Sequence, residues 1–169
     1  MPLTEVALAR TRELDEPIAA DLAAYLGEHV DEELGHDDDL LGDLELLSVD
    51  RESVLRRMPS PAVAALVGAQ YYWIHHHHPV AFLGFVAFME GYPPQPELVE
   101  LLVERTGFPR VTFHTLAEHG ELDPGHRDHL DATLDSLPLT AEHESVIGIS
   151  ATTTATLAAR VIEEVLSRT

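Results

Sequence analysis

Apolar residues recur three and four positions apart along most of the chain, which is the spacing of one face of an α-helix. The stretch 17–47 shows this spacing throughout, and the proline at its start suits a first helical turn, so we predict one long helix there. No stretch alternates apolar and polar residues as a half-buried strand does. Further helices are predicted at 51–57, 61–78, 80–91, 97–106, 110–135 and 140–167.

The apolar run at 80–91 is the element most easily mistaken for a buried strand. Its length, its continuity with the helix at 61–78 and its low content of β-branched residues favour a helix. The helix at 61–78 is apolar nearly all round, so we expect it in the centre of the molecule. The fold is therefore predicted to be all-α, a bundle of about six or seven helices in a single domain over residues 1–169.

Acidic side chains dominate the charge, with 30 Asp and Glu against 10 basic residues, all arginine, and a formal net charge of −20. This charge repels phosphate backbones, so we expect no nucleic-acid partner. The N-terminus lacks the basic-then-apolar order of a signal peptide, and we see no apolar run of 18 residues, so we expect no membrane partner and a cytoplasmic location. The absence of cysteine excludes disulfides, thiolate metal sites and cysteine nucleophiles.

The chain has eleven histidines among 169 residues, which indicates a possible metal site, because histidine and carboxylate without cysteine are the ligands of iron, manganese or zinc in nitrogen–oxygen sites. Glu33 and His36 stand three residues apart, so on a helix they share a face. Asp123 and His126 repeat this spacing. Glu32, four residues before His36, is an alternative to Glu33.

Two further residues complete a ligand set. Glu90 ends an apolar helix, where a buried carboxylate needs a partner, and His119 lies four residues before Asp123. Carboxylate-x-x-His pairs on facing helices, together with additional carboxylates, build dinuclear metal sites in helical bundles. The candidate metal ligands are therefore Glu33, His36, Glu90, His119, Asp123 and His126.

Several histidines and one aspartate have competing interpretations. Asp123 precedes Pro124 and suits an N-cap followed by a first-turn proline, or alternatively a kinked helix that still points 119, 123 and 126 inward. His29 lies seven residues before His36 and is either an extra ligand or a residue that supports one. The run His75–His78 cannot face one site, because four consecutive positions sweep more than a full turn.

Three stretches of the chain resemble those of the heme-oxygenase-like diiron oxidases and oxygenases, the iron-containing redox enzymes. They are HVDEELGHDDDLLGDLELL, QYYWIHHHHPVAFLGFVAFMEG and HGELDPGHRDHL. The resemblance covers residues 20–165 and implies a heme-oxygenase-like bundle that binds two Fe(II) ions, or manganese, with O2 as co-substrate. Glu33, His36, Glu90 and His119 would bind one ion or bridge both, and Asp123 and His126 would complete the second. Some relatives have a further upstream glutamate, for which Glu28 or Asp21 are the candidates.

The resemblance also implies an activity. The protein would oxidise a small organic molecule by N-oxygenation, oxidative decarboxylation or carbon–carbon cleavage, with an external electron donor and with no catalytic residues besides the metal ligands. The substrate would lie under an aromatic wall of Tyr71, Tyr72, Trp73, Phe85 and Phe88. If the chain assembles, we expect a homodimer. The alternatives are a non-catalytic iron-binding or ferritin-like bundle and a cofactor-free oxidase of the same fold.

Overall fold

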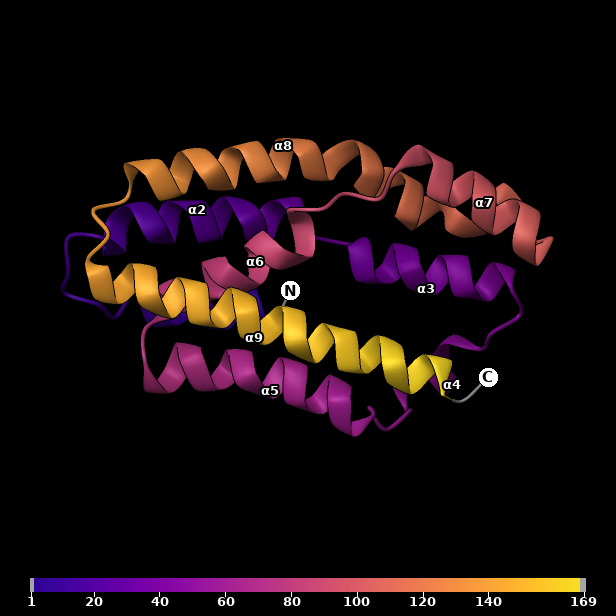
Figure 1. Ribbon diagram of the computed structural model, residues 1–169, viewed down its shortest axis with the longest axis horizontal. Helices are drawn as coiled ribbons and strands as arrows, with labels where there is room; N and C mark the ends of the chain where they lie inside the picture. The colour runs from indigo at the N-terminus through magenta and orange to yellow at the C-terminus, as the bar shows by residue number, and fades with distance from the viewer. Residues whose placement is uncertain (1, 168–169) are drawn as a thin grey trace.

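The protein, represented by a computed structural model that describes residues 2–167, consists of helices joined by short loops (Figure 1). No strand occurs among the described residues, as the sequence pattern predicts. The elements are α1 (Pro2–Thr11), α2 (Ala19–Glu32), α3 (His36–Leu46), α4 (Arg51–Leu55), α5 (Pro61–His76), η1 (Pro79–Ala81), α6 (Phe82–Glu90), α7 (Pro96–Thr106), η2 (Arg110–Phe113), α8 (His114–Ser136) and α9 (Ala141–Leu166).

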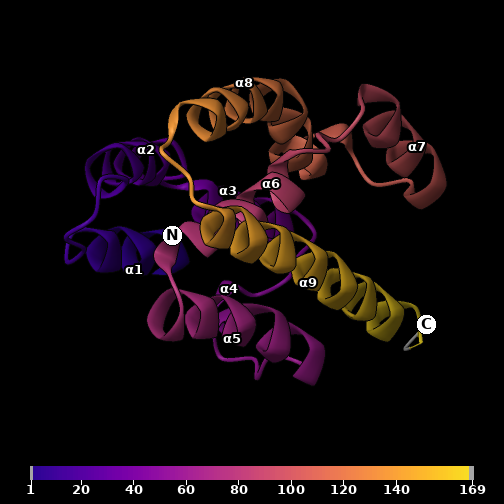
Figure 2. The same ribbon diagram turned by 60° about the vertical axis from the view of Figure 1, so that its left-hand side comes forward.

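The helices surround α6, which is short and central. The helix that we expected in the centre, at 61–78, is α5, which lies along one edge (Figure 1) with only Ala62, Gln70 and Ile74 buried, so that expectation is wrong. In Figure 1, α2 and α8 run side by side along one edge, and α9 and α5 run along the other, with α6 between them. Figure 2 shows α1 beside α2. The contacts agree: α9 packs on α5 and α6, α8 packs on α3, α6 and α7, and α1 packs on α2 and α5. This arrangement puts the ends of α2 and α6 against the middle of α8.

The α6–α9 contact depends on a glycine. A Cβ atom at Gly84 would lie 2.2 Å from the backbone oxygen of Ile147 and 2.8 Å from the backbone nitrogen of Ala151, distances that no carbon atom tolerates. The absence of a side chain therefore lets the two backbones approach closely. The fully buried residues include the apolar Leu22, Leu26, Ile74, Leu83 and Val86, and also the polar Gln70, which is hydrogen-bonded to Ser150 and Thr154 of α9.

The predicted helix at 17–47 is in fact two helices, which corrects the sequence-based boundary. Gly35 has a φ of 103°, a left-handed conformation that favours glycine, and it separates α2 from α3. Leu34 is 75% exposed, so the apolar spacing that suggested continuity includes one residue that faces solvent. The break allows α3 to turn away from α2 toward α8, and α3 contacts α8.

The remaining boundaries follow local capping chemistry. Ser60 accepts a hydrogen bond from the backbone of Val63 with proline next in the chain, which begins α5, and Thr140 begins α9 through a capping box with His143. Residues 2–11, where we predicted no element, form α1. Because of α1 and the break at Gly35, the described residues contain nine α-helices rather than six or seven.

The helix α9 has the length and composition of a membrane-spanning segment, which we did not anticipate. It has 26 residues, and its most apolar window has a mean hydropathy of 1.3, with 17% of that window buried. A helix packed in a protein core passes the same test, and α9 contacts α5 and α6. Length and composition alone therefore do not assign α9 to a membrane.

Candidate metal centre

The end of α2 presents one carboxylate to two histidines. Glu33 Oε2 lies 3.2 Å from His36 Nδ1, and Glu33 Oε1 lies 3.9 Å from His126 Nδ1. The break at Gly35 places His36 at the start of α3, and its ring still reaches back to Glu33. The neighbouring Glu32 reaches only His29 Nδ1, at 3.9 Å. Of the two glutamates considered from sequence, Glu33 is therefore the one at the centre of the cluster.

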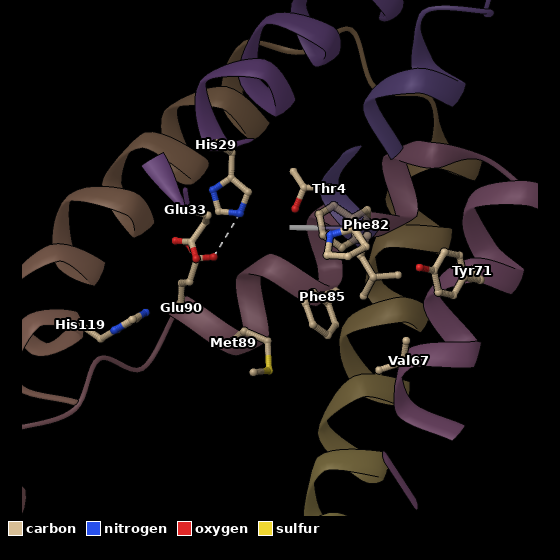
Figure 3. A pocket seen from close by; sticks show the side chains of 12 residues that line it. Thr4, His29, Glu33, Val67, Tyr71, Phe82, Phe85, Met89, Glu90 and His119 are labelled. Carbon is tan, nitrogen blue, oxygen red and sulfur yellow. Dashed lines mark ion pairs between the residues drawn. The ribbon is translucent and has the colours of Figure 1, made fainter. Parts of the chain in front are cut away.

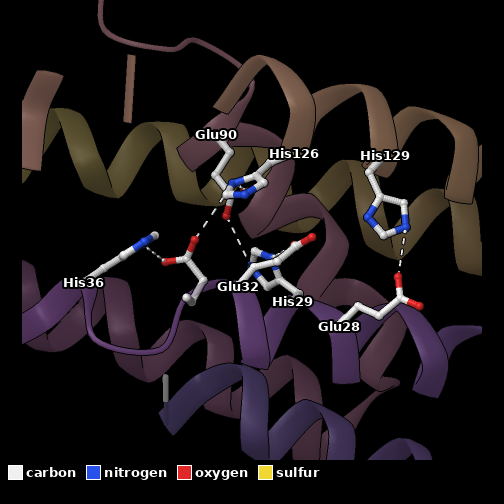
Figure 4. A network of polar contacts seen from close by, with 8 residues as sticks. Glu28, His29, Glu32, His36, Glu90, His126 and His129 are labelled. Atoms are coloured by element: carbon white, nitrogen blue, oxygen red, sulfur yellow. Dashed lines mark hydrogen bonds and ion pairs between the residues drawn. The ribbon is translucent and has the colours of Figure 1, made fainter. Parts of the chain in front are cut away.

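Glu90 points from the last turn of α6 toward α2 and α8. Its Oε1 lies 3.3 Å from His29 Nε2, and its Oε2 lies 3.6 Å from His126 Nδ1 (Figure 4). Burial raises the pKa of Glu90 to about 8, with further contributions from Glu33 and Asp123. A carboxylate in this position needs a cation or a proton to compensate its charge.

The helix α8 supplies His119, Asp123 and His126 and continues through Pro124. The capping interpretation of Asp123 is therefore wrong, because residue 123 lies within a helix and not at its start. Asp123 is 3% exposed. Burial raises the pKa of Asp123, and the nearby His119 and His126 oppose this shift. All three side chains thus belong to one buried region on one helix face.

The orientation of His119 leaves one ring nitrogen free. Its Nδ1 lies 2.8 Å from the carbonyl oxygen of Thr115, which can only accept, so Nδ1 carries the ring proton. Its Nε2 therefore keeps its lone pair, which is the arrangement that a metal-binding imidazole needs. The ring lies edge-on to that of His36, with centroids 4.8 Å apart.

Two groups of possible ligand atoms share Glu33. Glu33, His36 and His119 form one group, and His29, Glu33 and Glu90 form the other, with the ligand atoms of each group within 4.8 Å of one another. Among the predicted ligands, Asp123 and His126 belong to neither group, but His126 contacts both Glu33 and Glu90. A carboxylate common to two groups is the geometry of a residue that bridges two metal ions.

Unpartnered polar atoms support a cation at this position. Among the described residues, Glu90 Oε2, Asp123 Oδ1 and His126 Nδ1 are buried at the cluster without a hydrogen-bond partner. Buried polar atoms are rarely left unsatisfied in proteins, and a cation would satisfy lone pairs from several elements at once. Burial also lowers the pKa of His29, so its imidazole stays neutral and able to bind a metal. The residues present therefore fit a metal centre.

His29 is the candidate ligand whose role the sequence left open. It is 3% exposed and lies one helical turn before Glu33. The available signal was this spacing of four residues, which places both side chains on one face of α2. The suggested upstream carboxylates lie elsewhere: Asp21 is exposed, and Glu28 is exposed and contacts His129 (Figure 4).

A pocket of about 400 Å³ opens onto the cluster. His29, Glu33, Glu90 and His119 form one end of it, and α1, α5 and α6 provide the rest (Figure 3). Of the predicted aromatic wall, Tyr71 and Phe85 line the pocket together with Phe82, and the other three members are not among the residues that line it. The full lining is Pro2, Leu3, Thr4, His29, Glu33, Val67, Tyr71, Phe82, Phe85, Met89, Glu90 and His119.

The model of the iron-containing redox enzyme family matches residues 5–160. The chain belongs to this family. Among solved structures, a domain of unknown function from Shewanella denitrificans OS217 with a heme oxygenase-like fold is similar to it, with a TM-score of 0.84 and 22% identity. The match covers 99% of this chain and 72% of that chain, and it confirms the heme-oxygenase-like fold. No curated protein matches the sequence.

A second group of histidines lies apart from the candidate metal centre described above. Glu16 Oε2 lies 3.5 Å from His78 Nε2 and 3.7 Å from His143 Nε2. The backbone amides of Val80 and Thr140 donate to Nδ1 of His78 and His143, respectively. Since an amide only donates, each neutral ring carries its proton on Nε2, which then faces Glu16.

This tautomer distinguishes the second group from His119. A ring that binds a metal through Nε2 keeps its proton on Nδ1, and here Nδ1 accepts. We therefore interpret the group of Glu16, His78 and His143 as two imidazole donors facing one carboxylate rather than as a metal site. His75, His76 and His77 are exposed.

Proposed function

We propose that the protein is a non-heme diiron oxidase or oxygenase that uses O2 to oxidise a small organic molecule. The single observation that carries this proposal is the position of Glu33, which belongs to both groups of ligand atoms between α2, α6 and α8. Membership of the iron-containing redox enzyme family supports iron as the metal.

The charges of the cluster suit two divalent cations. Three carboxylates, Glu33, Glu90 and Asp123, offset three of the four positive charges of two Fe(II) ions. Four neutral imidazoles, His29, His36, His119 and His126, add nitrogen ligands without changing that balance. These seven side chains would hold the two ions, with Glu33 available to both, and would leave room for O2 and for water.

The bound iron would supply electrons to O2, with the remainder coming from the substrate or from an external electron donor. The protein's own residues position and protect this chemistry. His119 is oriented by the carbonyl of Thr115. Asp123 is 3% exposed and the side chain of Glu90 is 13% exposed, so both carboxylates are largely shielded from bulk water. Glu90, with its raised pKa, can also hold a proton in the metal-free protein, which it must release when a cation binds.

The pocket favours an enzyme over a storage protein. A storage protein needs an entrance for ions, whereas this cavity is lined largely by apolar and aromatic side chains next to Glu33 and Glu90. A cofactor-free oxidase would leave the unpartnered carboxylate oxygens of Glu90 and Asp123 without a role. Both alternatives predict different results from the test below.

The test is anaerobic loading with Fe(II), followed by iron analysis and by mixing with O2 in a stopped-flow spectrophotometer. We expect about two iron ions per chain and a transient visible absorption band. Iron binding without any oxygen-dependent band would favour storage. A protein that takes up no iron would refute the proposal, and the variant Glu33→Ala serves as the control that should lose both ions.

A further inference from the structure

The pocket has one charged end, and the rest of its lining is uncharged. Beyond His29, Glu33, Glu90 and His119, the residues that line it are apolar or carry a hydroxyl group. The helix α1 contributes Leu3 and Thr4, and α5 contributes Val67 and Tyr71. The phenylalanines Phe82 and Phe85 come from α6 (Figure 3). No arginine is among the described residues that line the pocket, and the chain contains no lysine.

The entrance is also apolar. Met89 is 49% exposed and Val67 is 37% exposed, whereas Phe82 is 2% exposed and lies deep in the pocket. The exposed residues of the lining, Pro2, Val67 and Met89, are all apolar, whereas the side chains of Glu33 and Glu90 are only 21% and 13% exposed. Because a buried anion without a cationic partner is unfavourable, the lining selects against a negative charge between the entrance and the cluster.

The size of the cavity limits the ligand. At about 30 Å³ per molecule of liquid water, 400 Å³ corresponds to roughly 13 water molecules, so a ligand of on the order of a dozen non-hydrogen atoms fits. The hydroxyl groups of Thr4 and Tyr71 are the uncharged polar groups of the lining. The Tyr71 ring lies parallel to that of His75, with centroids 6.3 Å apart.

We infer that the substrate is a mainly apolar molecule of this size that places its reacting group at the cluster and an uncharged body against α1, α5 and α6. This inference rests on the proposed function. Val67 and Tyr71 are then specificity-determining residues, because they line the wall opposite the cluster (Figure 3). Molecules with a carboxylate remote from the reacting group are excluded as substrates.

The test measures binding to the metal-free protein, so it does not depend on iron or turnover. The neutral fluorophore 1-aminonaphthalene, which is within the size limit above, is bound first and is then displaced by 1-octanol or by 8-hydroxyoctanoate at the same pH. These competitors have the same chain length and differ by the remote carboxylate. We expect 1-octanol to displace the fluorophore at a concentration at least about tenfold lower than 8-hydroxyoctanoate.

Two variants locate the binding. Val67→Trp should weaken fluorophore binding at least about fivefold by filling the cavity, whereas Val49→Trp should not, although Val49 is 36% exposed against 37% for Val67. Equal displacement by both competitors, no uptake of the fluorophore, or equal effects of both tryptophans would overturn the inference. If circular dichroism shows that Val67→Trp is unfolded, the comparison of the two competitors on the unmodified protein still tests the inference.

The two proposals fail separately. A protein that binds two iron ions but fails the displacement test keeps the proposed function and loses the substrate class. A protein that passes the displacement test but binds no iron has an apolar pocket without the proposed function, and the inference about a substrate then fails with that function.

Discussion

His29 Nε2 lies 3.3 Å from Glu90 Oε1, so the end of α6 meets the third turn of α2 within the buried cluster (Figure 4). The contact joins His29, whose role the sequence left open, to Glu90, which the sequence predicted as a metal ligand. Neither side chain has a full set of hydrogen bonds among the described residues, since His29 Nδ1 and Glu90 Oε2 are unpartnered. This relationship makes His29 a candidate metal ligand.

The first prediction concerns His29. We expect His29→Ala to lower iron affinity by at least about tenfold, because it removes a buried nitrogen donor beside Glu90. The control is His129→Ala, since His129 is partly exposed and contacts Glu28 outside the cluster. Iron is measured after anaerobic loading and gel filtration. Full iron content in His29→Ala would remove His29 from the ligand set.

The second prediction separates two adjacent glutamates. Glu33→Ala should lose both ions, because Glu33 belongs to both groups of ligand atoms. Glu32→Ala should retain them, because the side chain of Glu32 is 37% exposed and reaches only the far side of His29. The two variants remove the same charge from neighbouring positions, so electrostatics alone does not distinguish them. Equal iron contents would contradict the bridging position of Glu33.

The third prediction is a pH dependence. The pKa of Glu90 is raised to about 8 in the folded metal-free protein, against an ordinary value of 4.5. The unfolded chain therefore releases this proton first, and the contribution of Glu90 destabilises the metal-free fold progressively as pH rises from about 4.5 to about 8. Iron binding needs the carboxylate, so iron affinity should increase over the upper part of this range.

The variant Glu90→Gln isolates this effect. At pH 8 the metal-free variant should be more stable than the unmodified protein by about 1–3 kcal/mol, because it no longer requires a buried carboxylate. At pH 5 the difference should be smaller. Urea unfolding at the two pH values measures it. A variant that is less stable at pH 8 would show that the Glu90 charge is already compensated in the metal-free protein.

The fourth prediction concerns His78. Burial lowers the pKa of His78, the neighbouring His143 lowers it further, and Glu16 and Glu142 oppose the shift. With a lowered folded pKa, the stability from His78 is intact above about 6.5 and is lost as pH falls below that value. His78→Asn keeps a side-chain acceptor for the Val80 amide and does not titrate.

We therefore expect His78→Asn to lose less stability than the unmodified protein between about pH 7.5 and pH 5.5. Thermal unfolding of the metal-free protein at each pH is the measurement. His29 also has a lowered pKa and is present in both proteins, so the difference between them reports His78 alone. Parallel pH profiles would refute the prediction.

The fifth prediction concerns the α6–α9 contact. Gly84→Ala should destabilise the fold by about 1–3 kcal/mol, because the new methyl group would overlap the backbone of α9. Gly148→Ala should stabilise it by about 0.5–1 kcal/mol, because a Cβ atom there meets nothing within 4 Å and alanine favours the helix. Thermal unfolding compares the two. A harmless Gly84→Ala would show that the contact is looser than described.

The six ligands predicted from sequence lie in one region, but their partners were not predictable. Spacing along a helix relates residues within about one turn, so it indicated that Asp123 and His126 share a face. It could not show that His29 meets Glu90 across two elements, nor decide whether Asp123 caps a helix or lies inside one that continues through Pro124. The assignment of these residues as ligands remains a prediction that metal analysis tests.

Helical periodicity and composition are local properties of the chain, so the sequence alone predicted the all-α fold and the residue types available for a metal centre. The arrangement of the helices determines which carboxylate belongs to both groups of ligand atoms, since the left-handed turn at Gly35 lets His36 reach back to Glu33 while His29 lies one helical turn before Glu33 on α2. It also decided which aromatic residues line the pocket. Contacts between distant segments depend on how the helices pack, and no local pattern encodes them.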